Sequence, residues 1–108
     1  YEVVTSAFQS AGQRCTATSR VLVHRAVLDE FVARLIDQTV ALRVGPPGKD
    51  TFMGPMLSAA RRQRYLDRLA AARAQGAEPL RAPGQPELPG YFASPSLHLI
   101  RQRQPESE

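Results

Sequence analysis

The strongest constraint on the fold is a run of apolar residues at helical spacing between residues 27 and 44. Asp29 and Glu30 fall in its expected first turn and Arg43 in its last, where each charge favours the helix dipole. The sequence Gly-Pro-Pro at residues 45–47 then ends the pattern. We therefore predict a helix over residues 27–44 that must bury one face against another element. That face comprises Leu28, Phe31, Val32, Leu35, Ile36, Thr39 and Val40.

The residues before this helix change from helical to extended spacing. Apolar residues recur at helical intervals in residues 1–11, which predicts the last turns of a helix. Gly12 is placed to end it as a left-handed cap. Residues 18–24 are predicted to form a strand, because Val21, Leu22 and Val23 make a short apolar run of the kind that is buried.

A second helix is predicted over residues 59–75, with an apolar face that is weaker and rich in alanine. Ser58 is a candidate N-cap and Gly76 a candidate residue for the left-handed C-terminal turn. An extended piece over residues 78–81 and a strand over residues 91–100, interrupted at Pro95, are expected to follow. The order of helices and strands predicts an α/β architecture with strands covered by helices.

Composition limits the function classes without choosing among them. A chain of 108 residues allows one small domain with a thin core, and 43% hydrophobic with 22% charged residues argues against disorder. No apolar run approaches the roughly 18 residues of a membrane span. The net charge of +4 raises the question of an acidic partner. An enzyme or part of one, a basic binding module and an interaction domain all remain open.

Cys15 is the sole cysteine, so its importance must come from packing or from its thiol. One interpretation is a small buried hydrophobe. The polar neighbours in GQRCTATS favour a reactive thiol instead, because Arg14 would stabilise the thiolate and a turn leaves N–H groups for an oxyanion. His24 and His98 could in principle serve as its base, although both fit ordinary strand positions. We expect no metal site, because these residues are too isolated to form a cluster.

Arginines crowd the start of the second predicted helix. Arg61, Arg64 and Arg68 fall on one helix face, which could contact phosphates. No nucleic-acid motif accompanies them, and Tyr65 is the aromatic residue nearby. A solvated face or an interface with another domain fits better, so we expect no specific nucleic-acid partner.

Residues 8–35, FQSAGQRCTATSRVLVHRAVLDEFVARL, resemble the catalytic-cysteine region of the aldehyde dehydrogenase superfamily. The resemblance continues through FMGPMLS before the second helix and through GYFASP, and it covers about residues 5–100. QSAGQRCT with FMGPMLS is similar to succinylglutamate semialdehyde dehydrogenases and related semialdehyde dehydrogenases. The residues that match the cysteine motif are Phe8, Gly12, Gln13, Cys15, Ser19, Arg20, Val21, Leu22 and Val23.

The resemblance implies NAD(P)-dependent oxidation of a small aldehyde or semialdehyde to a carboxylate. Cys15 would be the nucleophile, passing through a thiohemiacetal and a thioester, and its N–H would help to bind the oxyanion. Thr16 would line the substrate channel. The resemblance also implies NAD or NADP as cofactor and a cytoplasmic homo-oligomer in full-length form, with no membrane partner.

The resemblance also implies what these residues lack. The family's general-base Glu, its oxyanion Asn and its Rossmann-type domain belong before Tyr1, and its Glu-x-Phe-Gly-Pro motif belongs beyond Glu108. We therefore expect residues 1–108 to be a partial catalytic domain, without cofactor-binding residues and inactive in isolation. The alternative is a non-enzymatic binding or regulatory module derived from that domain.

Overall fold

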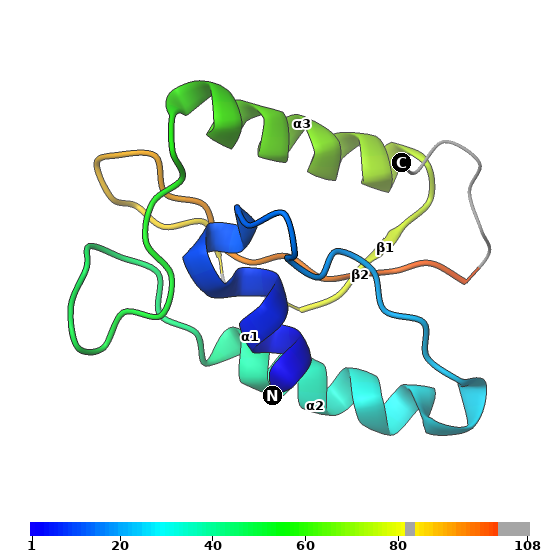
Figure 1. Cartoon of the computed structure of the whole chain (residues 1–108). Helices are drawn as coiled ribbons and strands as arrows, with labels where there is room; N and C mark the ends of the chain where they lie inside the picture. Colours follow the sequence, from blue (N-terminus) through cyan, green and yellow to red (C-terminus); the bar gives the residue numbers. More distant parts are fainter. Residues whose placement is uncertain (82–83, 102–108) are drawn as a thin grey trace.

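The computed structural model describes residues 1–81 and 84–101. Figure 1 shows α3 along one side of the molecule and α2 along the other, with α1 and the extended segments between them. The elements in chain order are α1 (Glu2–Phe8), η1 (Gln9–Gly12), η2 (Arg25–Val27), α2 (Leu28–Val40), α3 (Ala59–Ala74), β1 (Glu78–Pro79) and β2 (His98–Leu99).

The amphipathic helix is present, but it is shorter than the sequence predicted. A 3-10 turn, η2, leads into α2, which ends at Val40 rather than at residue 44. The chain leaves the helix because Val44 forms a parallel bridge with Met53, and the Arg43 carbonyl accepts the Met53 N–H at 3.1 Å. The prediction that Arg43 lies in the last turn of the helix is therefore wrong. The Arg43 Nη1 atom lies 3.8 Å from the Asp50 Oδ2 atom instead.

The face of α2 that was predicted to be apolar is the one that packs inward. Thr39 is completely buried on this face, and its apolar neighbours are half-buried. Asp29 and Glu30 lie in the first turn of α2, as expected. α1 packs against α2.

A short left-handed turn ends the first helix. α1 stops at Phe8, earlier than the predicted residue 11, and Ser10, Ala11 and Gly12 have φ angles of 56°, 55° and 66°. The left-handed conformation predicted for Gly12 is confirmed. A Cβ atom at Gly12 would lie 2.9 Å from the Ala7 carbonyl oxygen, so glycine is required there for space as well as for φ.

The buried strand predicted for residues 18–24 is wrong. This segment is extended, but it pairs with no other strand in the described part of the chain. Leu22 is fully exposed and Val21 is 41% exposed. Extended residues become a strand only when a neighbour satisfies their backbone groups, and an apolar sequence cannot supply that neighbour.

α3 forms where the sequence predicted it, from Ala59 to Ala74. The Ser58 hydroxyl accepts the Arg61 N–H at 3.2 Å, which confirms the N-cap. Gly76 has a φ of 89°, which confirms its left-handed position after the helix. Both signals act within a few residues, which explains why the local sequence predicted this helix well.

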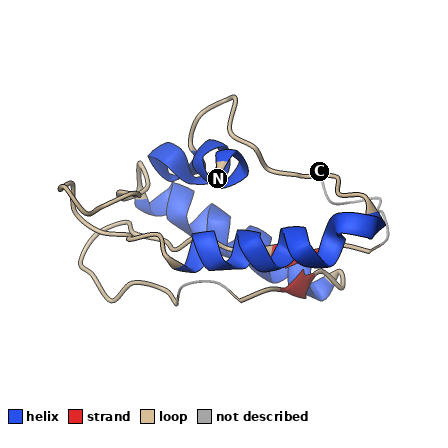
Figure 2. Ribbon diagram, turned by 90° about the horizontal axis from the view of Figure 1, so that it is seen from below, coloured by secondary structure: helices blue, strands red, loops and turns tan. Residues whose placement is uncertain are grey.

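Only a short part of the strand predicted over residues 91–100 forms a ladder in the described residues. Glu78 pairs with Leu99 and Pro79 with His98, in an antiparallel arrangement. Residues 91–96 dock on α3 instead, where the Phe92 carbonyl accepts from Arg62 at 2.6 Å and the Ser94 carbonyl from Tyr65 at 2.7 Å. Figure 2 shows the two short strands among helices and long loops, in an α/β arrangement as predicted.

The core is thin, as expected for a chain of this length. Among the described residues, the buried apolar side chains are Val4, Met53, Ala77, Phe92 and Ala93. No helix within residues 1–81 and 84–101 is long and apolar enough to cross a membrane.

We predict that Gly12→Ala destabilises the chain by about 1–2 kcal/mol, because alanine disfavours the left-handed region and its Cβ would press on the Ala7 carbonyl. Gly54→Ala is the matched control, since nothing lies within 4 Å of a Cβ at that position. Urea unfolding followed by circular dichroism measures both variants. Equal midpoints for the two would contradict the role given to Gly12.

Candidate functional site

Cys15 lies on a tight turn between the left-handed segment and the extended segment. The turn closes through a hydrogen bond from the Ala17 N–H to the Arg14 carbonyl at 3.1 Å, which leaves Cys15 and Thr16 at its centre. Both residues are exposed. The interpretation of Cys15 as a buried packing residue is therefore wrong, and its sulfur is open to solvent.

Two sets of hydrogen bonds fix this turn to the rest of the chain. On one side, the Gln13 side-chain oxygen accepts the Leu57 N–H at 2.8 Å, and its Nε2 donates to the Ser10 carbonyl at 3.2 Å. On the other side, the Thr18 N–H donates to the Ser6 carbonyl at 3.3 Å, and the two hydroxyl oxygens lie 2.6 Å apart. The turn is held at both ends while its centre stays open.

The centre of the turn carries unused backbone donors. In the part of the chain that the structure describes, the N–H groups of Cys15 and Thr16 donate no hydrogen bond. A free N–H beside a thiol can bind the oxygen of a carbonyl group under attack. The turn can therefore present both a nucleophile and a donor to an aldehyde.

Neither histidine is positioned as a base for the thiol. The sequence predicted His24 in a strand, and this prediction is wrong. His24 caps η2 instead, where its Nδ1 accepts the Ala26 N–H at 3.1 Å. His98 lies in β2, where burial and the nearby Arg73 charge lower its pKa. Among the described residues neither imidazole hydrogen-bonds to Cys15, and no cluster of His, Cys, Asp and Glu could hold a metal ion.

A pocket of about 520 Å³ opens beside the turn. Its lining comes from the end of α1, residues 11–14 and 17–19, the segment with Met53, Met56 and Leu57, α3, and residues 93–96. Cys15 and Thr16 are not part of the lining. Tyr65 of α3 also lines the pocket. Burial raises the pKa of its hydroxyl, and its hydrogen bond to Ser96 acts in the opposite direction.

The sequence indicated the arginine face of α3 but not its surroundings. Arg61, Arg64 and Arg68 all line the pocket, together with Arg14 from the Cys15 turn. No pattern in the sequence predicted that these two segments would share a cavity, because the packing that joins them is not local. We call this cavity the arginine pocket.

The described residues do not fit a nicotinamide dinucleotide. Such a cofactor needs a parallel sheet with a glycine-rich turn that leads into a helix N-terminus. Within residues 1–81 and 84–101 the sheet is one antiparallel pair of two-residue strands, and an arginine-rich first turn follows Ser58 in α3.

Comparison with known proteins identifies the family. The model of the aldehyde dehydrogenase family matches residues 1–104. The chain is 39% identical over 99 residues to the alpha-ketoglutarate semialdehyde dehydrogenase of Haloferax volcanii, covering 88% of this chain and 20% of that protein. It is 38% identical over 85 residues to the betaine aldehyde dehydrogenase of Brucella ovis, covering 78% and 18%. This chain belongs to the aldehyde dehydrogenase family, as the cysteine motif predicted.

Solved structures agree with this assignment. The proline utilization A mutant D778Y of Bradyrhizobium japonicum superposes with a TM-score of 0.83 at 33% identity, over 91% of this chain and 10% of that one. PnpE in complex with nicotinamide adenine dinucleotide superposes with a TM-score of 0.82 at 32% identity, over 89% and 21%. The chain spans about a fifth of the length of the curated relatives described above.

We predict that iodoacetamide alkylates Cys15 in the folded chain at least as fast as in urea-unfolded chain, because the thiol is exposed. Mass spectrometry over time measures the rate without ambiguity, since Cys15 is the sole cysteine. Cys15→Ser is the control for labelling elsewhere. Alkylation that occurs only in urea would show that the thiol is buried.

Proposed function

We propose that residues 1–108 form part of the catalytic domain of an aldehyde dehydrogenase and that Cys15 is its nucleophile. The observation that carries this proposal is an exposed cysteine on a turn anchored at both ends, in a chain that belongs to this family. An anchored turn can present a thiol in one orientation without burying it, as attack on a substrate requires.

The proposed chemistry starts at the Cys15 sulfur. The thiolate attacks the aldehyde carbon, a C–S bond forms, and the π electrons of the carbonyl move to its oxygen, which gives a thiohemiacetal. The free N–H of Cys15 stabilises that oxygen. Loss of a hydride to an acceptor supplied by the complete protein would convert the thiohemiacetal into a thioester on Sγ. Attack by water would then release the acyl group as a carboxylate and return the thiol. Proton removal from the thiol is assigned to a residue outside this chain, because neither histidine is bonded to Cys15.

We propose that the complete protein uses NAD or NADP, held by residues outside residues 1–108. The structures of PnpE and of a 1-pyrroline-5-carboxylate dehydrogenase from Thermus, to which this chain is similar, contain NAD. Such a cofactor supplies a hydride acceptor when bound. The role of residues 1–108 is to hold the substrate carbon on Cys15 in a fixed position.

The proposed substrate is a small aldehyde, and the proposal favours a semialdehyde. The Haloferax volcanii relative is named for alpha-ketoglutarate semialdehyde, which supports this preference. Thr16, exposed beside Cys15 at the centre of the turn, is assigned to the substrate channel. We also propose that the complete protein is a cytoplasmic homo-oligomer.

We predict that Cys15→Ser lowers kcat/KM for aldehyde oxidation by about a thousandfold or more in the complete protein, because a hydroxyl is a far weaker nucleophile than a thiolate. Formation of NADH or NADPH measures the rate. Arg25→Gln, a substitution on η2, is the control and is expected to leave the rate unchanged.

The same assay on residues 1–108 alone is expected to give no turnover, because residues 1–81 and 84–101 provide neither a base hydrogen-bonded to Cys15 nor a dinucleotide site. Activity that survives Cys15→Ser in the complete protein would refute the nucleophile. A complete protein that never oxidises aldehydes would favour a non-enzymatic binding or regulatory module.

A further inference from the structure

The arginine pocket gathers positive charge from two separate segments. Arg14 comes from the Cys15 turn, and Arg61, Arg64 and Arg68 come from one face of α3. Among the described residues, the side chains that line the pocket include no aspartate or glutamate. This lining therefore carries positive charge from two segments and no carboxylate.

These four guanidinium groups are also unpaired within the described residues. Other arginines of the chain have acidic partners: Arg34 with Glu30 at 2.6 Å and Arg101 with Glu78 at 3.8 Å. No such pair involves the pocket arginines. Like charges around one cavity repel one another, and Arg61 also opposes the dipole at the start of α3. Both effects favour an anion in the pocket.

The pocket is built on a fixed scaffold. Arg62, next to Arg61, has a different task, because its Nε donates to the Phe92 carbonyl at 2.6 Å and holds residues 91–96 against α3. Tyr65 does the same through Ser94 and Ser96, so its hydroxyl is already used. Arg61, Arg64 and Arg68 thus project from a helix that other residues hold in position. A volume of about 520 Å³ is in the range of small-molecule sites.

We propose that the arginine pocket binds a small polyanion, with carboxylate or phosphate groups at two ends that reach Arg14 and the α3 arginines. The planar fork of a guanidinium group matches both anions through paired hydrogen bonds. A single negative charge would leave most of the positive charge of the four arginines uncompensated, which favours a ligand with two or more charges. Cys15 does not line the pocket, so a test of anion binding can be separated from a test of the proposed nucleophile.

The test uses inorganic pyrophosphate and citrate as probes, titrated into the 108-residue chain by calorimetry at constant ionic strength. The double variant Arg64→Gln, Arg68→Gln is expected to raise the dissociation constant about tenfold or more, since it removes charged hydrogen-bond donors. Comparison of the two probes shows whether phosphate or carboxylate is preferred. Cys15→Ser is expected to bind normally, so failure of the nucleophile and failure of this site give different results.

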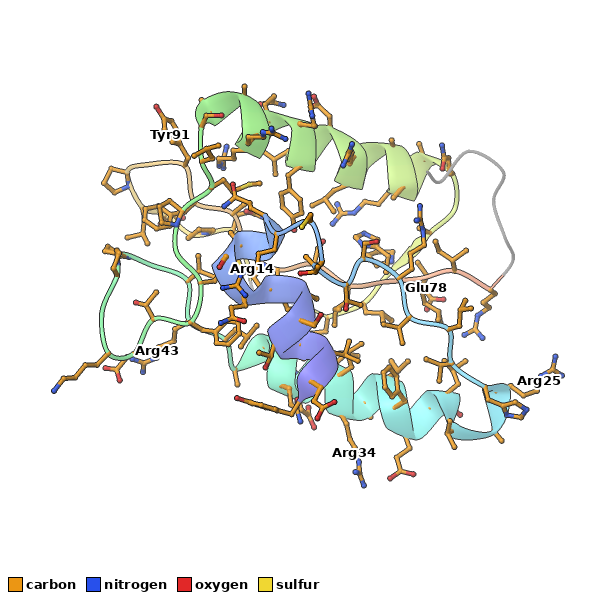
Figure 3. All side chains as sticks on the ribbon, in the orientation of Figure 1. Arg14, Arg25, Arg34, Arg43, Glu78 and Tyr91 are labelled. Atoms are coloured by element: carbon orange, nitrogen blue, oxygen red, sulfur yellow. The ribbon has the colours of Figure 1, made fainter. Side chains whose placement is uncertain are left out.

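The matched control is the double variant Arg25→Gln, Arg34→Gln, which removes the same charge elsewhere. Figure 3 shows both residues beside η2 and α2, on the opposite side of the molecule from α3. This control is expected to change the dissociation constant less than about twofold. Equal weakening by both double variants would mean nonspecific attraction and would overturn the proposal.

Two further results would overturn the proposal. One is that neither probe binds at concentrations up to about 10 mM. A chain that shows no helical circular dichroism in the presence of the probes counts as the same negative result. The other is binding of poly-glutamate while neither small anion binds, which would assign the pocket to an acidic protein segment. Probe binding that is lost only in the Arg64→Gln, Arg68→Gln variant supports the proposal.

Discussion

The hydrogen bond from the Leu57 N–H to the Gln13 side chain joins the Cys15 turn to the segment that leads into α3, and the site depends on both. Gln13 follows the left-handed turn at Ser10–Gly12, and Leu57 precedes the cap of α3. Because the bond spans these segments, it fixes the Cys15 turn relative to the helix that carries the arginine pocket. The left-handed turn lies between the end of α1 and Gln13, and Gly12 has space there for no side chain.

The parts of the fold that local chemistry controls could be predicted from the sequence. The Ser58 cap, the left-handed Gly76 and the extent of α3 depend on neighbours within a few residues. The strands could not be predicted in the same way. Residues 18–24 have the composition of a strand but no partner in the described part of the chain, and residues 91–96 give their carbonyls to α3. Pairing is a property of distant segments.

The candidate site likewise has features that depend on local sequence and features that depend on distant segments. The family could be predicted, because a cysteine between polar neighbours after a glycine is a local pattern, and the family match over residues 1–104 confirms that resemblance. The catalytic role of Cys15 stays a prediction. The surroundings could not be predicted. The anchors of Gln13 and Thr18 reach to Leu57 and Ser6, and Arg14 shares a cavity with α3. The same turn thus carries an exposed thiol and an arginine that lines a pocket, the two groups on which our proposals depend.

The central claim is that the Cys15 turn is anchored at both ends and open at its centre. Amide hydrogen exchange tests it most directly. The Leu57 and Thr18 N–H groups, which are hydrogen-bonded to Gln13 and Ser6, are predicted to exchange at least about tenfold more slowly than those of Cys15 and Thr16. Gln13→Ala is predicted to remove the protection of Leu57 while leaving the helical amides of α3 protected. Exchange of Leu57 and Thr18 as fast as Cys15 would contradict the anchored turn.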